Sequence, residues 1–347
     1  MSSQRIPAPR SARRRLLSAA PLSVALAGSL LLAGCAAPEP RGAGDLEALE
    51  GISLEVAEDG SPTVTVDEKI ETSEVSSRVL KDGDGEEIDN GDLVLVKTAV
   101  ADSASGEVQA DNFTQGSEAV FVNDQLKESN TVLYDMLEQN KVGAQVAFFM
   151  PASQLGQQGG TDQLMVFEIA GTSPVRAEGE PVEVTDESLP EVTVDEETGE
   201  PTIAQPEGDA PKEMITQPLI AGDGETVGES DYVTVRYKGV KWSDGEEFDS
   251  DWQRGTPTGF GLNQVIAGWT EGLSGQKVGS QVLLVVPPEK AYGDSEGNDL
   301  QKETLVFVVD ILHAMPPAQP AEPAPAPSGD ASPPAESPTA EPSPSDS

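Results

Sequence analysis

The chain has 347 residues, of which 37% are apolar, 24% are charged and only 4% are aromatic, and its formal net charge is −40. This length accommodates two domains of ordinary size and additional segments. Such a negative charge excludes nucleic acid as a partner, because phosphate binding needs clustered Lys and Arg. Like charge also keeps copies of the chain apart in solution.

The chain contains one cysteine, Cys35, and one histidine, His313. One cysteine excludes a disulfide within the chain and a cysteine-rich zinc site. One histidine, at the end of the last expected strand, leaves no base for a Ser/His/Asp or Cys/His arrangement elsewhere. Hydrolase chemistry of the usual kind is therefore disfavoured, and we assign no metal and no cofactor.

Residues 1–34 have the composition of a targeting segment, with five arginines ahead of an apolar run that begins at Leu16. The run ends in Leu-Ala-Gly-Cys at Cys35, which resembles a bacterial lipoprotein signal. The resemblance implies cleavage before Cys35 and attachment of the lipidated residue to the bilayer, on the extracytoplasmic face of the cell membrane. A retained transmembrane helix is the alternative, and it is disfavoured because the run is short and contains Pro21 and Gly28.

Two parts of the sequence repeat each other, and we call them the first copy (Gly44 to Gly171) and the second copy (Glu180 to Met315). Pro-Thr-Val at Pro62 matches Pro-Thr-Ile at Pro201, an offset of 139 residues. The same offset aligns a Gly-Asp-Gly-Glu sequence in the first copy with an identical one in the second. One fold present twice is the economical explanation.

The second copy predicts a small sheet around one short helix. Ile266, Trp269 and Leu273 recur at i, i+3 and i+7, which places them on one face of a helix, and the flanking segments have a period of two, which is typical of strands. In the first copy, the corresponding region keeps a buried helix face, with apolar side chains at Leu133, Met136 and Leu137. The predicted fold class is α+β, with an antiparallel sheet wrapped on a short helix in each copy.

The remaining segments are poor in apolar residues. We expect a flexible tether over 35–50, an acidic linker with a leading strand over 173–212, and a disordered Pro/Ala/Ser/Glu-rich tail over 316–347. The tail cannot bury enough apolar area to offset its ordering entropy, although a Pro-rich recognition role is conceivable. The two domains then occupy 51–172 and 213–315.

Five motifs of the second copy occur in a fixed order. They are Val-Thr-Val-Arg-Tyr-Lys-Gly from Val233, Asp-Gly-Glu-Glu-Phe-Asp-Ser from Asp244, Val-Ile-Ala-Gly-Trp from Val265, Ala-Tyr-Gly from Ala291 and Leu-Val-Phe from Leu305. Their order and spacing resemble the FKBP-type peptidyl-prolyl cis/trans isomerase family. The resemblance implies two tandem FKBP-like domains in an isomerase that acts on X-Pro bonds of exported polypeptides, with macrolide inhibitors as further ligands.

The resemblance also implies a site in the second copy, with an aromatic floor, apolar walls and an acid beside them. Trp269 would form the floor under the proline ring, and the Ile266 N–H would bind a substrate carbonyl. The residues implied as catalytic are Tyr237, Phe248, Asp249, Trp269, Tyr292 and Phe307, and those implied as substrate-binding are Arg254, Val265, Ile266 and Leu300. Taken singly, each aromatic residue is more often part of a core.

The first copy lacks this set of residues, since Thr98 stands at the place of Tyr237 and Leu133 at about the place of Trp269. It is interpreted as a scaffold without an isomerase site, and a binding role for it stays open.

The second copy also departs from the family, with Thr258 in place of an aromatic residue and 294–302 in place of the loop that roofs the pocket. This altered roof bears on catalytic efficiency and on macrolide affinity. It motivates an alternative function, a protein that holds proline-containing segments without catalysis. A purely structural acidic spacer would leave the clustered aromatic residues unexplained.

Overall fold

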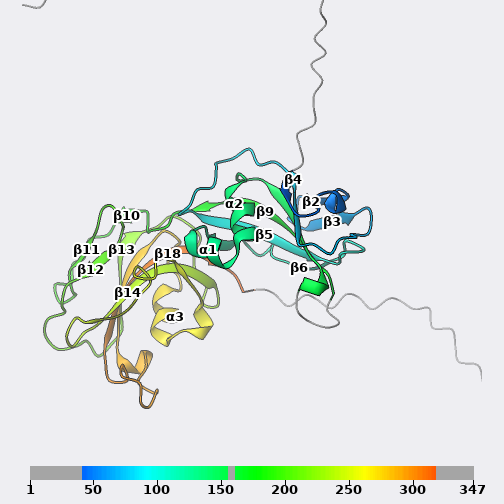
Figure 1. Cartoon of the computed structure of the whole chain (residues 1–347). Coiled ribbons are helices and arrows are strands. Elements are labelled where there is room, and N and C mark those ends of the chain that lie inside the picture. Colours follow the sequence, from blue (N-terminus) through cyan, green and yellow to red (C-terminus); the bar gives the residue numbers. More distant parts are fainter. Residues whose placement is uncertain (1–40, 155–160, 318–347) are drawn as a thin grey trace, which may run out of the picture. The chain divides into compact units, whose positions relative to one another are not determined.

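The computed structural model describes residues 41–154 and 161–317 (Figure 1). All of them belong to one unit, Pro40–Ser347. The predicted signal segment, Cys35 and tail residues 318–347 lie outside the described residues. Within the described ranges, no helix combines the length and apolarity needed to cross a membrane.

The first copy forms a seven-stranded antiparallel sheet in the order β1-β4-β8-β9-β5-β6, with β7 also paired to β5. Strands β2 and β3 form a separate hairpin. The elements are β1 (Gly42–Ala43), η1 (Glu47–Leu49), β2 (Ile52–Val56), β3 (Pro62–Val66), β4 (Ser76–Lys81), β5 (Leu93–Ala101), β6 (Val108–Asp111), β7 (Glu118–Phe121), α1 (Asp124–Ser129), α2 (Thr131–Glu138), β8 (Gln145–Met150), η2 (Ala152–Gln154) and β9 (Gln163–Ser173).

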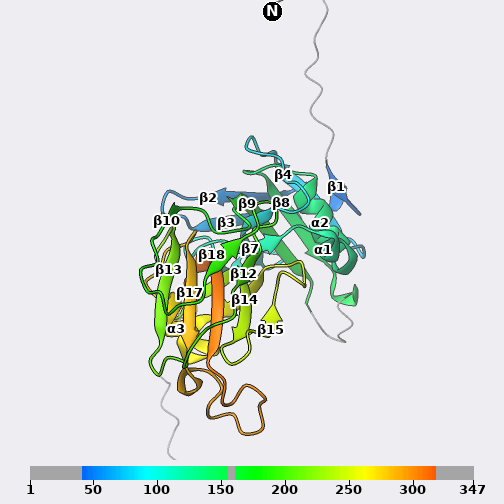
Figure 2. The same ribbon diagram turned by 90° about the vertical axis from the view of Figure 1, so that its left-hand side faces the viewer.

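The second copy has the same strand order, β10-β13-β17-β18-β14-β15, with β16 also paired to β14, as the repeat in the sequence predicts. Figure 2 shows β13, β17, β18 and β14 side by side. The elements are β10 (Glu180–Pro181), β11 (Val192–Val194), β12 (Pro201–Ile203), β13 (Ile215–Ala221), β14 (Tyr232–Lys241), β15 (Glu247–Ser250), β16 (Thr258–Gly261), η3 (Leu262–Gln264), α3 (Ala267–Leu273), β17 (Gln281–Val286), η4 (Pro288–Lys290) and β18 (Leu305–Met315).

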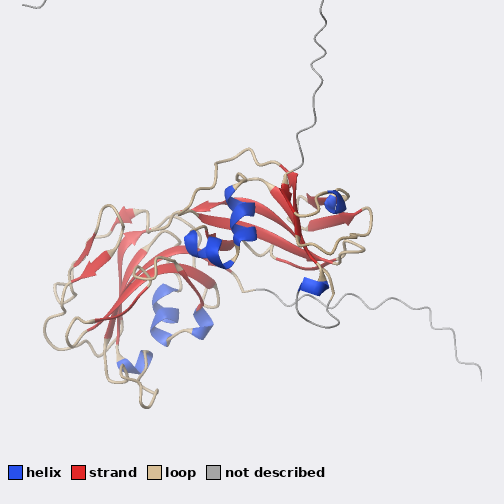
Figure 3. Cartoon of the chain, in the orientation of Figure 1, coloured by secondary structure: helices blue, strands red, loops and turns tan. Residues whose placement is uncertain are grey.

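Strands dominate the described chain and its helices are short (Figure 3), which agrees with the predicted α+β class. Helix α3 lies where the i, i+3, i+7 pattern predicts it, with Trp269 and Leu273 buried. In the first copy, α2 buries Met136 and Leu137, and Leu133 is half-buried.

The outer limits of the two predicted domains remain predictions. The described part of the segment expected to be a flexible tether, 35–50, contains β1, which pairs with β4, and η1, whose Leu49 is buried in the core.

The sheet of the second copy is covered on both faces. All six residues of β17 are buried. Val282, Leu284 and Val286 join the core on the side of α3, whereas Leu283 and Val285 join a second core on the opposite side. Because successive side chains of a strand point to opposite faces, a doubly covered strand has a continuous apolar sequence and no alternation.

The second core is closed by a β-hairpin that the sequence analysis did not predict. Residues 173–212 were expected to be an acidic linker with one leading strand, but they contain β10 and the hairpin β11–β12. Ile203 of this hairpin is 9% exposed and packs with Val240 of β14 and with Trp242, which directly follows β14. The first copy has a matching hairpin, β2–β3, whose apolar residues join its own core.

The turn of the hairpin explains its acidic sequence. One Asp195 oxygen accepts hydrogen bonds from the N–H groups of Glu197 and Thr198 and from the Thr198 hydroxyl. These bonds lower the pKa of Asp195, with the Thr198 N–H as the largest cause. Gly199 has φ +75°, a conformation that favours glycine. Asp195 therefore serves turn formation as well as solubility.

The docked hairpin gives the first prediction. Ile203→Ala should lower the free energy of unfolding by about 2 to 4 kcal/mol, because it removes a buried side chain and leaves a cavity. Thr202→Ala, on the exposed face of the same strand, is the matched control and should change it by about 0.5 kcal/mol or less. Urea unfolding of both variants measures the difference. Equal, small effects would contradict a docked hairpin and favour the linker.

Candidate active site

A hollow of about 300 Å³ lies on the α3 side of the sheet in the second copy. This volume is at the lower end of the range for small-molecule sites. It is lined by Tyr237, Phe248, Asp249, Phe260, Gln264, Val265, Ile266, Trp269, Tyr292 and Phe307. The structure therefore brings together eight of the ten residues that the sequence analysis assigned to the site.

Several elements contribute to this hollow because of simple strand and helix periodicity. Tyr237 shares a core with Val233 and Val235, its neighbours at intervals of two along β14. Phe307 lies on the same side of β18 as Val309. Trp269 is in the first turns of α3, which packs against β17. Residues far apart in the sequence therefore converge on one face of the sheet.

Trp269 is the centre of the aromatic packing. Its ring lies edge-on to Tyr237, Phe260 and Phe307, with centroid distances of 5.2, 5.3 and 5.5 Å and interplanar angles of 81° to 88°. Edge-to-face contacts of this kind add stability beyond the buried area, because the positive edge of one ring meets the negative face of another. The floor of the hollow is therefore a set of closely packed aromatic rings.

One wall carries a closed set of three polar groups. The Tyr237 hydroxyl donates to Asp249 Oδ2. Arg254 donates from Nη1 to Asp249 Oδ1 at 2.6 Å and from Nη2 to the Tyr237 oxygen at 2.9 Å. Burial, followed by the hydrogen bond to Asp249, raises the pKa of Tyr237 above its ordinary value. The hydrogen bond to Asp249 is also the largest cause that raises the pKa of Arg254.

The indole N–H of Trp269 is buried at the hollow and has no acceptor within the described part of the chain. The Ile266 N–H, which directly precedes α3, and the Tyr292 hydroxyl also lack an acceptor there. Burial, and after it the charge of Asp249, raises the pKa of Tyr292, so this hydroxyl stays protonated at neutral pH. The Ile266 N–H and the Tyr292 hydroxyl can each donate a hydrogen bond to a bound ligand.

Two lining residues, Phe260 and Gln264, are not among those expected from the sequence. The resemblance pointed to the position after Pro257, which is Thr258, but the aromatic side chain of β16 is at Phe260, two residues further on. The period of two along this short strand could have identified Phe260.

Two residues predicted to bind substrate lie outside the lining of the hollow. Arg254 acts on Asp249 and Tyr237 from outside it. Leu300 is half-buried against the same core.

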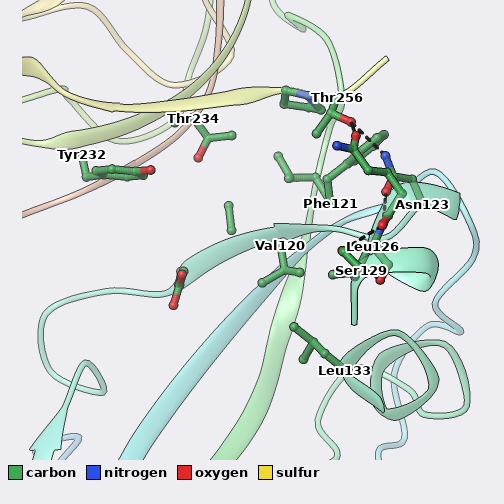
Figure 4. A pocket seen from close by; sticks show the side chains of 15 residues that line it. Val120, Phe121, Asn123, Leu126, Ser129, Leu133, Tyr232, Thr234 and Thr256 are labelled. Carbon is green, nitrogen blue, oxygen red and sulfur yellow. Dashed lines mark hydrogen bonds between the residues drawn. The ribbon is translucent and has the colours of Figure 1, made fainter. Parts of the chain in front are cut away.

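A second hollow, of about 420 Å³, contains none of the predicted site residues (Figure 4). Residues of both copies line it, among them Leu133, Tyr232 and Thr256. The Thr256 hydroxyl donates to Gln125 Oε1 and accepts from Asn123 Nδ2, both at 3.0 Å. This second hollow has no aromatic floor comparable to Trp269. The hollow of about 300 Å³ is therefore the better candidate for the active site.

The fold and the smaller hollow are those of one class of protein. In this class, an antiparallel sheet packs on a short helix, and a tryptophan forms the floor of an aromatic pocket. Residues 224–312 match the family described as FKBP-type peptidyl-prolyl cis-trans isomerase. Over 115 residues the chain is 44% identical to a probable FK506-binding protein of Corynebacterium glutamicum. This alignment covers 33% of this chain and 98% of that relative. The chain belongs to the FKBP-type peptidyl-prolyl isomerase family and is an enzyme of that type.

A further relative is longer than the matched region. The chain is 45% identical over 104 residues to the isomerase FkpA of Escherichia coli, which is 30% of this chain but only 38% of FkpA. The crystal structure of FkpA aligns with 37% identity and a TM-score of 0.29, covering 38% of this chain and 54% of the FkpA chain. The sequence match therefore spans only about a third of each protein.

The raised pKa of Tyr237 gives a second prediction. An unfolded tyrosine loses its proton near pH 10, but the folded chain keeps Tyr237 protonated to higher pH, so its contribution to stability is lost as the pH rises above about 10. Between about pH 8 and about pH 11, the wild type should therefore lose more unfolding free energy than Tyr237→Phe. Urea unfolding at a series of pH values measures this, and parallel curves for the two proteins would contradict it.

Proposed function

We propose that the aromatic hollow of the second copy is where this enzyme isomerises X-Pro bonds. Rotation about an amide is slow because the planar form has partial double-bond character, with a barrier of about 18–20 kcal/mol. A twisted amide has less charge separation than a planar one, so an apolar pocket favours it more than water does. The Trp269 floor, surrounded edge-on by three aromatic rings, supports this proposal most directly.

The polar groups at the hollow position the bound peptide. The Ile266 N–H and the Tyr292 hydroxyl hold carbonyl groups of the peptide on either side of the proline. Asp249, paired with Arg254, lies at the wall beside Tyr237. No group has to gain or lose a proton, because rotation of an amide needs neither a nucleophile nor a base.

We further propose that the substrates are exported polypeptides and that Cys35 anchors the enzyme by lipid at the extracytoplasmic face of the cell membrane. The Leu-Ala-Gly-Cys sequence and the arginine-rich segment ahead of it support this. Cells that express the chain and are fed a labelled fatty acid should incorporate the label into the wild type and leave Cys35→Ser unlabelled. Label in both proteins, or in neither, would contradict the anchor.

The first copy is proposed to be a scaffold without an isomerase site. Thr98 supplies no aromatic ring at the place of Tyr237, and the family match is confined to residues 224–312. Its helix α2 fills the space under the sheet with its own apolar side chains.

Refolding of a client limited by proline isomerisation distinguishes a catalyst from a holding protein. An enzyme should accelerate the slow phase, which lasts about 10–100 s without it, when present at a small fraction of the client concentration. FK506, which the Corynebacterium relative is named for binding, is proposed to occupy the same hollow and should abolish the acceleration. A client whose refolding has no proline-limited phase is the control. An effect only at stoichiometric amounts would favour the holding function.

A further inference from the structure

Asp251 has the place in the second copy that Asn112 has in the first, where Asn112 Oδ1 accepts the Thr98 N–H at 2.6 Å. Asp251 follows β15 directly, is fully buried and carries a carboxyl group. Strands β14 and β15 pair through Lys238 with Ser250 and Gly239 with Asp249, so the next pair in the ladder would be Tyr237 with Asp251. In an antiparallel ladder the Tyr237 N–H would bind the Asp251 main-chain carbonyl.

The Asp251 side chain takes the place of that carbonyl. Its Oδ1 accepts the Tyr237 N–H at 3.1 Å, and the Asp251 N–H donates to the Tyr237 carbonyl at 3.2 Å. The Asp251 carbonyl is thereby free to accept the Gly255 N–H at 2.9 Å, which closes a turn over residues 251–255. The side chain lets the strand end in a turn while both polar groups of the Tyr237 backbone stay satisfied.

This turn returns Arg254 to the active-site wall. Arg254 binds Asp249 and the Tyr237 hydroxyl, so Tyr237 is held at its backbone by Asp251 and at its hydroxyl by Asp249 and Arg254. A cation–π contact also stabilises the turn, since the guanidinium of Arg236 on β14 lies 4.5 Å from the ring centroid of Trp252. The position of the wall therefore depends on where the turn begins, which is at Asp251.

The Asp251 carboxyl group accepts a backbone hydrogen bond through one oxygen, while its other oxygen has no hydrogen-bond partner among the described residues. This other oxygen, Oδ2, is buried, and the buried Arg236 Nε and Ser250 Oγ also lack a partner there. Burial, with a smaller contribution from the charge of Asp310 on β18, raises the pKa of Asp251 to about 7, although the Tyr237 N–H and the charges of Arg236 and Arg254 lower it. The hydrogen bond from the Tyr237 N–H is the side-chain hydrogen bond that the structure gives to Asp251.

We propose that Asp251 is a positioning residue of the isomerase site, which fixes the Tyr237 backbone and the 251–255 turn so that Tyr237 and Arg254 meet Asp249 at the wall of the hollow. This inference rests on the proposed function of that hollow. Asp251 does not line the hollow and does not touch the substrate, so its effect should appear in kcat and leave KM nearly unchanged.

The test compares Asp251→Asn, Asp251→Ala and Asp251→Val in the full chain, with kcat and KM for an X-Pro peptide and urea unfolding of each. Asparagine keeps an acceptor at Oδ1 and should retain kcat within about threefold, whereas alanine and valine should lose about tenfold or more. Valine fills most of the space of the Asp251 side chain and has no hydrogen-bond acceptor. Asp251→Val therefore still tests the proposal if Asp251→Ala does not fold. Ile203→Ala, destabilised on the face of the sheet opposite the hollow, is the matched control and should keep the wild-type kcat.

The possible failures are distinguishable. An inactive wild type would contradict the function proposed for the hollow. An active wild type together with a folded Asp251→Val variant of unchanged kcat would overturn the role of Asp251 and leave that function intact. A loss of kcat in Ile203→Ala as large as in Asp251→Val would show that stability, and not positioning, is what matters.

A pH series adds a readout specific to the carboxyl group. The unfolded chain releases the Asp251 proton near pH 4 and the folded chain near pH 7, so folding stability should fall as the pH rises between these values. Asp251→Asn should lack this part of the pH dependence. Identical pH dependence in the wild type and Asp251→Asn would contradict a buried, titrating Asp251.

Discussion

The structure of the second copy depends on the close packing of helix α3 against strand β17. A Cβ atom placed on Gly268 would lie 2.4 Å from Val286 Cγ1, so the helix can approach the sheet this closely only because that residue is glycine. The approach brings Trp269 under the rings of Tyr237, Phe260 and Phe307. A looser helix would leave the indole without its edge-on neighbours and the hollow without a floor.

The other face of the same sheet is closed by the hairpin β11–β12, which is tied to the active-site strands as well as to the core. Lys238, the residue after Tyr237, pairs with Glu200 in front of β12 and with Glu247 on β15. Its side chain is only 12% exposed, so the hairpin and β15 together enclose the ammonium group and supply its two carboxylate partners. The second copy is therefore a three-layer unit, with helix, sheet and hairpin.

The sequence predicted the helix face and the repeat well, because Trp269 and Leu273 follow the helical period and one offset aligns the two copies. The sequence did not predict the hairpin, because Val192, Val194 and Ile203 are scattered among acids, and the role of Asp195 in the turn is visible only from its hydrogen bonds. It found most of the hollow through motifs. It could not find Asp251, because a carboxylate that replaces a main-chain carbonyl has no local pattern in the sequence and is recognised only from strand register.

The central claim is that the Trp269 pocket, and no other part of the chain, carries out isomerisation. The most direct test measures cis-to-trans conversion of an X-Pro peptide by the full chain with Trp269→Leu and, as a matched control, Tyr134→Leu on the buried face of α2 in the first copy. Trp269→Leu should lower kcat/KM by about one to two orders of magnitude while the control keeps it. Unchanged kcat/KM in a folded Trp269→Leu variant would contradict the account.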